Sequence, residues 1–352
     1  MTDNSLVIVV SHPDALTELG IAADRQPSNV IKEYQERIAA NTVRRQTADL
    51  RSFESFLQAA WKWETNEHLV LSLATNIEHW RGVNGSLVEN FVKWLLKTGY
   101  AIGTVNIRLS TVKRYAKLAC KAKVIDEATC AQIKMVDGYS HKQSLNKDRE
   151  REVTRIVRPG AKKAESVSFS KEHAAKLKDQ PDTPQGRRDA LLMCLLLDHG
   201  LRCGEVAGLK VTDFDLKAKT FTFYRAKVGK IQTHLMTKDT FQAATAYFKS
   251  DVPAVGALLL GSRREGATGK SGGKLEGAMS TRAINGRVGV LGNAIGIDRL
   301  SPHDCRHYWA TRAARNKTDL FALQDAGGWN SLAMPRRYVE SAKIANEGVK
   351  LD

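Results

Sequence analysis

Residues 138–165 separate two regions of the chain that are rich enough in apolar residues to form cores. The segment has few apolar residues, and Pro159 followed by Gly160 interrupts any helix. Its eight cations are Lys142, Lys147, Arg149, Arg151, Arg155, Arg158, Lys162 and Lys163, and its four acids are Asp148, Glu150, Glu152 and Glu165. Such a segment is typical of a basic interdomain linker. The 352 residues are therefore predicted to form an N-terminal extension (1–28), a first domain (29–137), this linker, and a second domain with a C-terminal tail (166–352).

The first domain is predicted to be helical. Asn41 can begin a helix that runs to Ala60, Ser86 and Glu89 fit a capping box, Gly99 can end that second helix, and Thr104 can begin a third. The apolar residues at helical spacing are Leu50, Phe53, Leu57 and Ala60 in the first helix, Val88, Phe91, Val92, Leu95 and Leu96 in the second, and Val105, Leu109, Val112 and Ala116 in the third.

The third helix also carries cations that lie mostly off its apolar stripe: Arg108, Lys113, Arg114, Lys117 and Lys121. A helix with one apolar and one basic face packs on a core and can present its cations to phosphates. The whole chain has a formal net charge of +16, which favours a polyanionic partner such as nucleic acid. A solvated face on an ordinary basic protein is the alternative at this point.

Cysteine spacing and hydropathy indicate a reduced, non-membrane environment. The five cysteines include no pair at C-x-x-C spacing, so we predict no metal site, no cofactor and free thiols in the cytoplasm. The longest strongly apolar stretch, 190–197, is far shorter than the ~20 residues of a membrane span and predicts a buried helix. The N-terminus lacks the basic region of a secretion signal.

The second domain is predicted to be mixed. Ser170 can cap a helix, a helix over Arg187–His199 ends at Gly200, and strands over Thr220–Ala226 and Ile231–Thr237 are joined by a turn. The predicted fold class is therefore mainly α with a small antiparallel β-sheet. The stretch 266–274 resembles a phosphate-binding loop but lacks the required glycine at position 264, so it is interpreted as a surface loop.

Three separated stretches of the second domain stand out: His199-Gly-Leu-Arg202-Cys-Gly-Glu205, Pro302-His303-Asp-Cys-Arg306-His307, and the segment from Gly328-Trp329 to Tyr338. Each alone has a plain explanation, such as a surface ion pair or a packed tyrosine. In this order they resemble the tyrosine recombinase (phage integrase) family, over roughly residues 166–345. That pattern has an arginine in G-L-R-x-x-E, a hairpin lysine, H-x-x-R-H, a histidine or tryptophan, and a tyrosine. Residues 41–125 are similar to the family's helical core-binding domain.

The resemblance implies six catalytic residues: Arg202, Lys227, His303, Arg306, Trp329 and Tyr338. Tyr338 would attack phosphorus and form a 3′-phosphotyrosine, which conserves the bond energy for rejoining. The two arginines would bind phosphate oxygens in the transition state, with a further hydrogen bond from the indole of Trp329. Lys227 would protonate the leaving 5′-oxygen, with Lys230 as a close competitor. His303 would assist proton transfer at the tyrosine, and Glu205 would orient the site.

The resemblance also implies a site-specific recombinase or integrase that binds double-stranded recombination sites as a homotetramer and acts through a Holliday junction. Such an enzyme would be cytoplasmic, associated with the nucleoid and carried by a phage, a transposon or another mobile genetic element, or by the chromosome. Two alternatives stay open, namely a type IB topoisomerase-like relaxing enzyme and a non-catalytic DNA-binding protein of the same fold. One departure is tryptophan at position 329, where histidine is more usual.

Overall fold

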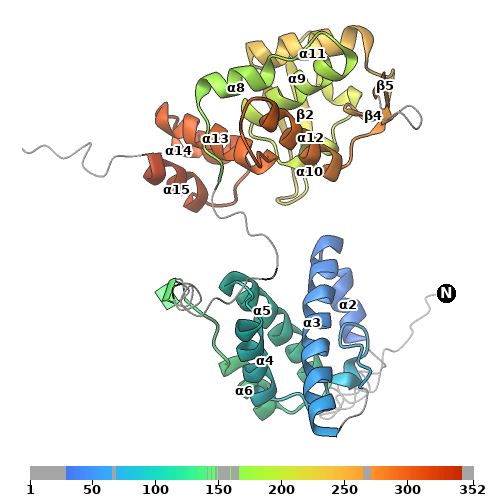
Figure 1. Ribbon diagram of the computed structural model, residues 1–352, viewed down its shortest axis with the longest axis vertical. Coiled ribbons are helices and arrows are strands. Elements are labelled where there is room, and N and C mark those ends of the chain that lie inside the picture. The colour runs from blue at the N-terminus through green and yellow to red at the C-terminus, as the bar shows by residue number, and fades with distance from the viewer. Residues whose placement is uncertain are drawn as a thin grey trace, which may run out of the picture. The chain divides into compact units, whose positions relative to one another are not determined.

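A computed structural model describes residues 29–65, 69–140, 166–264 and 271–342, with positions 142–143, 145–146, 149 and 159 between the second and third ranges. The chain divides into two compact units, Met1–Lys162 and Lys163–Asp352, and the ribbon of each is drawn in Figure 1. The predicted extension 1–28, most of the predicted linker and tail residues 343–352 lie outside the described residues. The domain boundaries therefore stay predictions.

The first unit is helical around an aromatic core. The rings of Phe53 and Phe91 lie 4.8 Å apart, and the buried indole of Trp80 donates from Nε1 to the Leu73 carbonyl at 3.0 Å. Pairing that donor removes the cost of burying it. The described elements are α2 (Val30–Glu36), α3 (Ala40–Thr65), the 3₁₀ helix η1 (Ile77–Trp80), α4 (Gly85–Lys97), α5 (Ile102–Lys121) and α6 (Glu127–Met135).

The predicted apolar stripes of this unit are confirmed, but the three predicted helix starts are wrong. All stripe residues are buried except Ala60 and Leu96, which are half-buried. Helix α3 begins at Ala40, so Asn41 lies inside it instead of capping it. Helix α4 is capped by Asn84, whose side chain accepts from the Leu87 N–H at 3.0 Å, so Ser86 lies inside the helix instead of capping it. Helix α5 begins at Ile102 without a side-chain cap, two residues before Thr104.

The second unit is built around α9 (Pro184–Leu197), in which every residue from Leu191 to Leu197 is buried. A helix that is apolar on all sides must lie inside the fold, and α9 packs against α8, α11 and α13. The other helices are α8 (Lys171–Lys178), α10 (Cys203–Ala207), η2 (Val211–Asp213), α11 (Lys238–Ser250), α12 (Thr281–Ala294), α13 (Pro302–Arg315), α14 (Leu320–Gly327) and α15 (Ala333–Ala342). Ser170 caps α8 as predicted. In the described part of the chain, no helix has the length and apolar character to cross a membrane.

Two small antiparallel sheets complete this unit and confirm the predicted fold class. The first has the order β1 (Phe214–Asp215), β2 (Thr220–Arg225) and β3 (Lys230–Leu235), with Arg225 paired to Lys230 next to the turn. The second pairs β4 (Leu260–Arg264) with β5 (Ser271–Ala278) and was not predicted. The surface-loop prediction for 266–274 is therefore wrong for Ser271–Lys274, which lie in β5, and its first part lies outside the described residues.

Candidate active site

The second unit brings all six predicted catalytic side chains to one open cavity of about 640 Å³. They come from five places in the chain: the start of α10, the β2–β3 turn, α13, the α14–α15 loop and α15. The six are Arg202, Lys227, His303, Arg306, Trp329 and Tyr338. Residues up to 136 positions apart in the sequence, Arg202 and Tyr338, therefore share one concave surface.

The start of α10 places Arg202 against Glu205. Arg202 is the N-cap residue, and its backbone N–H donates to the Glu205 carboxylate at 2.7 Å. Its side-chain Nη1 donates to the other carboxylate oxygen at 2.8 Å. Glu205 is buried and does not line the cavity, so its oxygens hold the arginine without facing the substrate space. This contact agrees with the orienting role predicted for Glu205.

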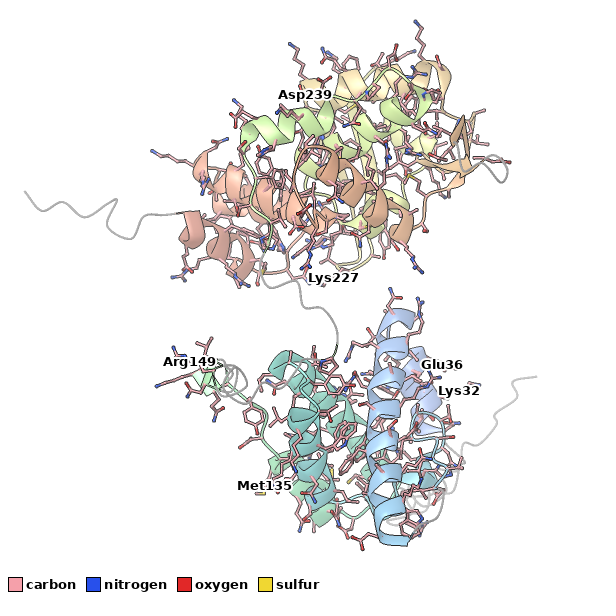
Figure 2. All side chains as sticks on the ribbon, viewed as in Figure 1. Lys32, Glu36, Met135, Arg149, Lys227 and Asp239 are labelled. Atoms are coloured by element: carbon pink, nitrogen blue, oxygen red, sulfur yellow. The ribbon has the colours of Figure 1, made fainter. Side chains whose placement is uncertain are left out.

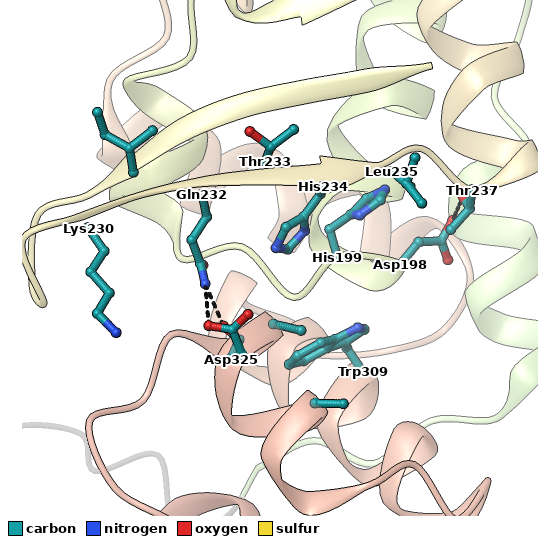
Figure 3. A pocket seen from close by; sticks show the side chains of 13 residues that line it. Asp198, His199, Lys230, Gln232, Thr233, His234, Leu235, Thr237, Trp309 and Asp325 are labelled. Atoms are coloured by element: carbon teal, nitrogen blue, oxygen red, sulfur yellow. Dashed lines mark hydrogen bonds between the residues drawn. The ribbon is translucent and has the colours of Figure 1, made fainter. Parts of the chain in front are cut away.

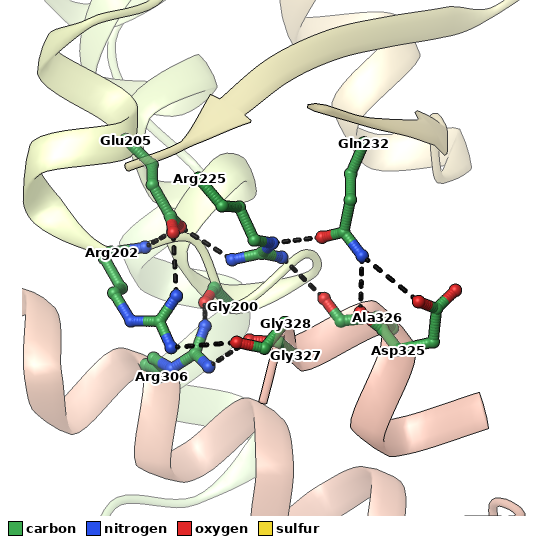
Figure 4. Close-up of polar contacts among 10 residues, drawn as sticks. All are labelled: Gly200, Arg202, Glu205, Arg225, Gln232, Arg306, Asp325, Ala326, Gly327 and Gly328. Atoms are coloured by element: carbon green, nitrogen blue, oxygen red, sulfur yellow. Dashed lines mark hydrogen bonds and ion pairs between the residues drawn. The ribbon is translucent and has the colours of Figure 1, made fainter. Parts of the chain in front are cut away.

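The C-terminal end of α14 supplies three consecutive carbonyl oxygens to three arginines (Figure 4). Arg225 donates to Ala326 at 2.6 Å, Arg306 to Gly327 at 2.5 Å and Arg202 to Gly328 at 3.3 Å. Gly328 ends the helix with φ of +57°, a left-handed conformation that glycine adopts without strain. Carbonyls at a helix C-terminus carry partial negative charge, so they stabilise neighbouring cations.

Arg225 is a member of this cluster that sequence reasoning missed. Its side chain is fully buried, and it donates to Glu205 at 2.8 Å and to the side chain of Gln232. Burial lowers its pKa, while the charge of Glu205 opposes that shift. The alternation of β2 contained the signal, because Phe221, Phe223 and Arg225 occupy its buried positions.

Arg306 lies on α13 with its guanidinium between two carbonyls and an indole ring. It donates to the carbonyls of Gly200 and Gly327, and its carbon Cζ lies 4.7 Å from the centre of the Trp329 ring. Burial lowers the pKa of Arg306, and the positive charges of Arg202 and Arg225 lower it further. Contact with the face of the Trp329 ring partly offsets the cost of burying this charge.

Tyr338 is 4% exposed and lies among aromatic rings. The ring centre of His307 is 5.2 Å from it and that of Trp329 is 5.7 Å from it. Burial raises the pKa of Tyr338, against the lowering effect of Arg306, so the phenol is protonated at neutral pH and needs a proton acceptor. His307 Nε2 lies 3.1 Å from Nε2 of His303, and burial lowers the pKa of His307. The motif contains both histidines, but only His303 was predicted to act.

The two candidate lysines line different cavities. Lys227 lies in the β2–β3 turn and is exposed at its tip (Figure 2). Lys230 begins β3 and lines a second open cavity of about 690 Å³ between β3 and the helices α13 and α14 (Figure 3). That second cavity contains none of the six predicted catalytic residues. The geometry favours Lys227 over Lys230, because Lys227 shares the cavity of the other candidates, and its role as general acid stays a prediction.

The cations predicted to bind DNA in the first unit differ in their exposure and in their contacts with other residues of the unit. Arg108 donates to Ser52 at 2.9 Å and lies 4.0 Å from the centre of the Tyr100 ring. Lys113 donates to the Lys134 carbonyl at 2.8 Å. Arg114, Lys117 and Lys121 are exposed and, at spacings of three and four, share one face of α5. Over the residues that the structure describes, no group of three histidine, cysteine or acidic side chains is placed to hold a metal ion.

Comparison with known proteins identifies this arrangement. Residues 168–344 match the phage integrase family. The tyrosine recombinase XerC of Methylobacterium sp. (strain 4-46) is 30% identical over 218 residues, which cover 59% of this chain and 63% of that protein. The tyrosine recombinase XerA of Thermococcus onnurineus is 24% identical over 281 residues, covering 75% of this chain and 95% of that protein. The chain belongs to the phage integrase family of tyrosine recombinases.

Solved structures share the fold at low sequence identity. The Tn1549 transposon integrase, solved with a circular intermediate DNA, has a TM-score of 0.57 at 14% identity, covering 88% of this chain and 93% of that one. A lambda integrase dimer bound to a core site also has a TM-score of 0.57, at 13% identity, covering 97% and 85%. The proteins named here are recombinases and integrases, so the comparisons give no support to the topoisomerase alternative.

Proposed function

We propose that this chain is a site-specific DNA recombinase that cleaves and rejoins double-stranded DNA through a 3′-phosphotyrosine on Tyr338. The observation that carries the proposal is the convergence of the six predicted side chains on one cavity. Family membership supports the same activity. A non-catalytic protein of this fold has no need to retain a buried arginine cluster beside a tyrosine, because unpaired buried charge destabilises a fold.

The charge of the cluster suits a phosphodiester. The Glu205 carboxylate pairs with Arg202 and Arg225, while Arg306 donates to carbonyl oxygens, so one negative charge in this cluster stands against three positive ones. Attack on a phosphodiester adds negative charge to the phosphate oxygens, and fixed cations in a water-poor site stabilise that charge most. Arg202 and Arg306 line the cavity, so these two are proposed to contact the phosphate, with the Trp329 indole as a further donor.

Two proton transfers complete the proposed reaction. Tyr338 gives its proton to the histidine pair when its oxygen attacks phosphorus, with His303 at the cavity and His307 beside the phenol ring. Lys227 gives a proton to the departing 5′-oxygen. Rejoining reverses both transfers, so the cycle consumes no nucleotide and needs no cofactor.

The proposed assembly is a homotetramer that exchanges strands through a Holliday junction, associated with the nucleoid and serving a mobile genetic element. The solved relatives support DNA recombination sites as partners, because the lambda integrase is bound to a core site and the XerH site-specific recombinase is bound to a palindromic difH substrate. In this proposal the first unit and the basic segment 138–165 bind DNA flanking the cleaved phosphate.

Trapping the covalent adduct tests the activity. Candidate sites from the DNA that flanks the coding sequence would be synthesised with a nick, so that the cleaved fragment diffuses away and the adduct persists. We expect a protein–DNA species that survives denaturation, with the DNA on the peptide that contains Tyr338. Specific binding without any such adduct on a bound site would favour the non-catalytic alternative, and relaxation of supercoils without strand exchange would favour the topoisomerase alternative.

Deleting the residues after Ser341 tests the assembly, because the removed tail is proposed to dock on a neighbouring subunit. We expect single-site DNA binding to persist while the paired-site complex weakens in native gels. Normal assembly of two sites by the shortened protein would contradict a role for the tail.

A further inference from the structure

Arg225 contacts three of the elements around the candidate active site but does not line its cavity. It is absent from the cavity wall, and its side chain is fully buried. Its three donor directions reach three different elements: Nη1 to Glu205 on α10, Nη2 to the Ala326 carbonyl at the end of α14, and Nε to Gln232 on β3. Figure 4 shows the guanidinium between these elements.

Each of these elements carries or holds a proposed catalytic group. Glu205 uses its other oxygen to bind Nη1 of Arg202 at 2.8 Å. The two carbonyls after Ala326 bind Arg306 and Arg202, and the next residue is Trp329. Gln232 donates to the Asp325 carbonyl at 2.6 Å, and Arg225 lies two residues before Lys227. The side chain therefore ties the hairpin that carries Lys227 to α10, next to Arg202, and to the end of α14, whose carbonyls bind Arg306 and Arg202.

The packing around Arg225 is tight. A methyl group added at Gly328 would lie 2.3 Å from Cδ of Arg225, so the backbone of the α14–α15 loop rests on this side chain. A guanidinium presents a rigid fork of donors, whereas a lysine offers a single ammonium that cannot reach three elements at once. A buried charge held this way costs more than an apolar side chain of similar size, so core formation does not explain it.

We propose that Arg225 is a positioning residue for strand cleavage: it sets the guanidiniums of Arg202 and Arg306 at the phosphate through Glu205 and the end of α14, without touching DNA. This inference rests on the proposed function. A positioning role and a purely structural role predict different results. If Arg225 is a positioning residue, its substitution should lower the rate of the cleavage step, and the size of that loss should depend on the charge of the phosphate.

A second buried arginine provides the matched control. Arg188 is 1% exposed, pairs with the buried Asp189 at 2.7 Å and donates to the Leu260 carbonyl at 2.9 Å. It resembles Arg225 in burial, carboxylate partner and carbonyl contact, but it lies outside the cavity and its contacts. The variants R225K and R188K keep the positive charge in both places and lose the planar fork.

Single-turnover cleavage at saturating protein distinguishes a positioning role of Arg225 from a purely structural one. We expect R225K to cut at least about 10-fold more slowly than the unmodified protein, since small displacements of catalytic groups cost that much, with DNA affinity changed less than twofold. R188K should cut at nearly the normal rate, whatever its melting temperature. R225M is expected to be slower still, and if it does not fold, R225K decides the question.

A substrate with a neutral methylphosphonate at the cleaved position supplies the sharpest readout. Its transition state carries one negative charge fewer, so the alignment of the arginines matters less and the deficit of R225K should shrink markedly. Equal deficits on both substrates, or equal rates for R225K and R188K, would overturn the inference while leaving the proposed function intact. Absence of an adduct with the unmodified protein on a bound site would instead reject the proposed function, and this inference with it.

Discussion

The two units of this protein bury different kinds of side chain. The first unit has an aromatic core, and its buried polar residues among those described are Gln46, Asp49 and Thr111. Asp49 is the one charged side chain in that set, whereas the second unit buries several, among them Arg188, Asp189, Glu205, Arg225 and Arg306. Charges are costly to desolvate, so the group formed by Glu205, Arg225 and Arg306 beside one cavity indicates a site that needs fixed cations. The exposed cations of the first unit suit a surface that binds a polyanion by summed, exchangeable contacts.

This contrast predicts that substitutions at the site of the second unit have large effects on cleavage, whereas substitutions of the exposed cations in the first unit have small, additive effects on DNA affinity. The largest effect is expected for Tyr338→Phe, which removes the proposed nucleophile and keeps the ring that packs against Trp329. The variant should bind DNA normally and form no adduct on a nicked substrate. Tyr308→Phe, which alters a tyrosine stacked on Phe169 instead, is the control. Adduct formation by the Tyr338 variant would contradict the assignment.

Arg306→Lys should have the next largest effect on cleavage. The ammonium keeps the charge but cannot bind both the loop carbonyls and two phosphate oxygens, so we expect a loss of about 10²–10³ in cleavage rate. DNA affinity should change little, because many other cations share the phosphate contacts. Single-turnover rates and binding isotherms measured on the same site provide the check. Parallel losses in rate and affinity would argue against transition-state stabilisation.

Lys227→Ala should slow cleavage by roughly 10²-fold, the usual size of a general-acid contribution. A substrate with sulfur at the leaving 5′-position departs without protonation, so it should restore most of the rate. Lys230→Ala is the matched control, since that lysine lines the other cavity. If sulfur rescues the Lys230 variant and not the Lys227 variant, the acid lies at the start of β3.

Acid should destabilise the second unit before the first. Burial lowers the pKa of His199 to about 3 and that of His234 to about 4, against about 6.5 in an unfolded chain. The unfolded state therefore binds more protons than the folded state between pH 6.5 and 4, and stability is lost as pH falls through that window, on the order of a few kcal/mol. His79, the histidine described in the first unit, is not buried.

Hydrogen exchange followed by mass spectrometry at pH 7 and at pH 4.5 resolves the two units within the intact chain. His199→Asn should flatten the pH dependence of the second unit, because it removes one of the two histidines whose pKa is lowered in the folded state. An equal loss of protection in both units would contradict the assignment of acid sensitivity to these histidines.

The smallest effect is expected at the exposed cations of α5. Lys117→Ala should weaken binding to all DNA sequences by a similar factor and reduce the slope of log affinity against log salt by about 0.9. The same change at Lys113, whose ammonium binds the Lys134 carbonyl, should alter the slope less. Equal slopes for the unmodified protein and the Lys117 variant would remove α5 from the DNA interface.

The sequence allowed the helices α3, α4, α5, α8 and α9 and the six candidate catalytic positions to be predicted, for identifiable reasons. Apolar spacing in α4 and α5 reflects burial, which the structure confirms. The start of α4 was harder to predict, because two residues able to cap a helix, Asn84 and Ser86, lie only two positions apart. The order of the motifs sufficed to select Arg306 and Tyr338. The choice between Lys227 and Lys230 needed the hairpin's register and its neighbours, which local sequence does not contain.

The carbonyl acceptors of Arg225, Arg306 and Arg202 could not be predicted from local sequence, for a different reason. Every residue has a carbonyl group, so nothing distinguishes those of Ala326, Gly327 and Gly328 until α14 ends beside the arginines. The same holds for Gly200, whose carbonyl accepts from Arg306. Long-range contacts between β2 and α14 turn an ordinary strand residue into the link between the hairpin and the cavity.

The carbonyls at the end of α14 also determine how the site tolerates genetic change. A substitution can delete a carboxylate such as Glu205, but none can delete a peptide oxygen, so three anchors of the cationic cluster survive any replacement that preserves the helix end. We therefore expect a saturation library to accept many residues at Ala326, and few at Gly327 and Gly328, where a side chain would collide with Trp329 and Arg225. Related enzymes can thus diverge widely along α14 and still present the same acceptors to their arginines.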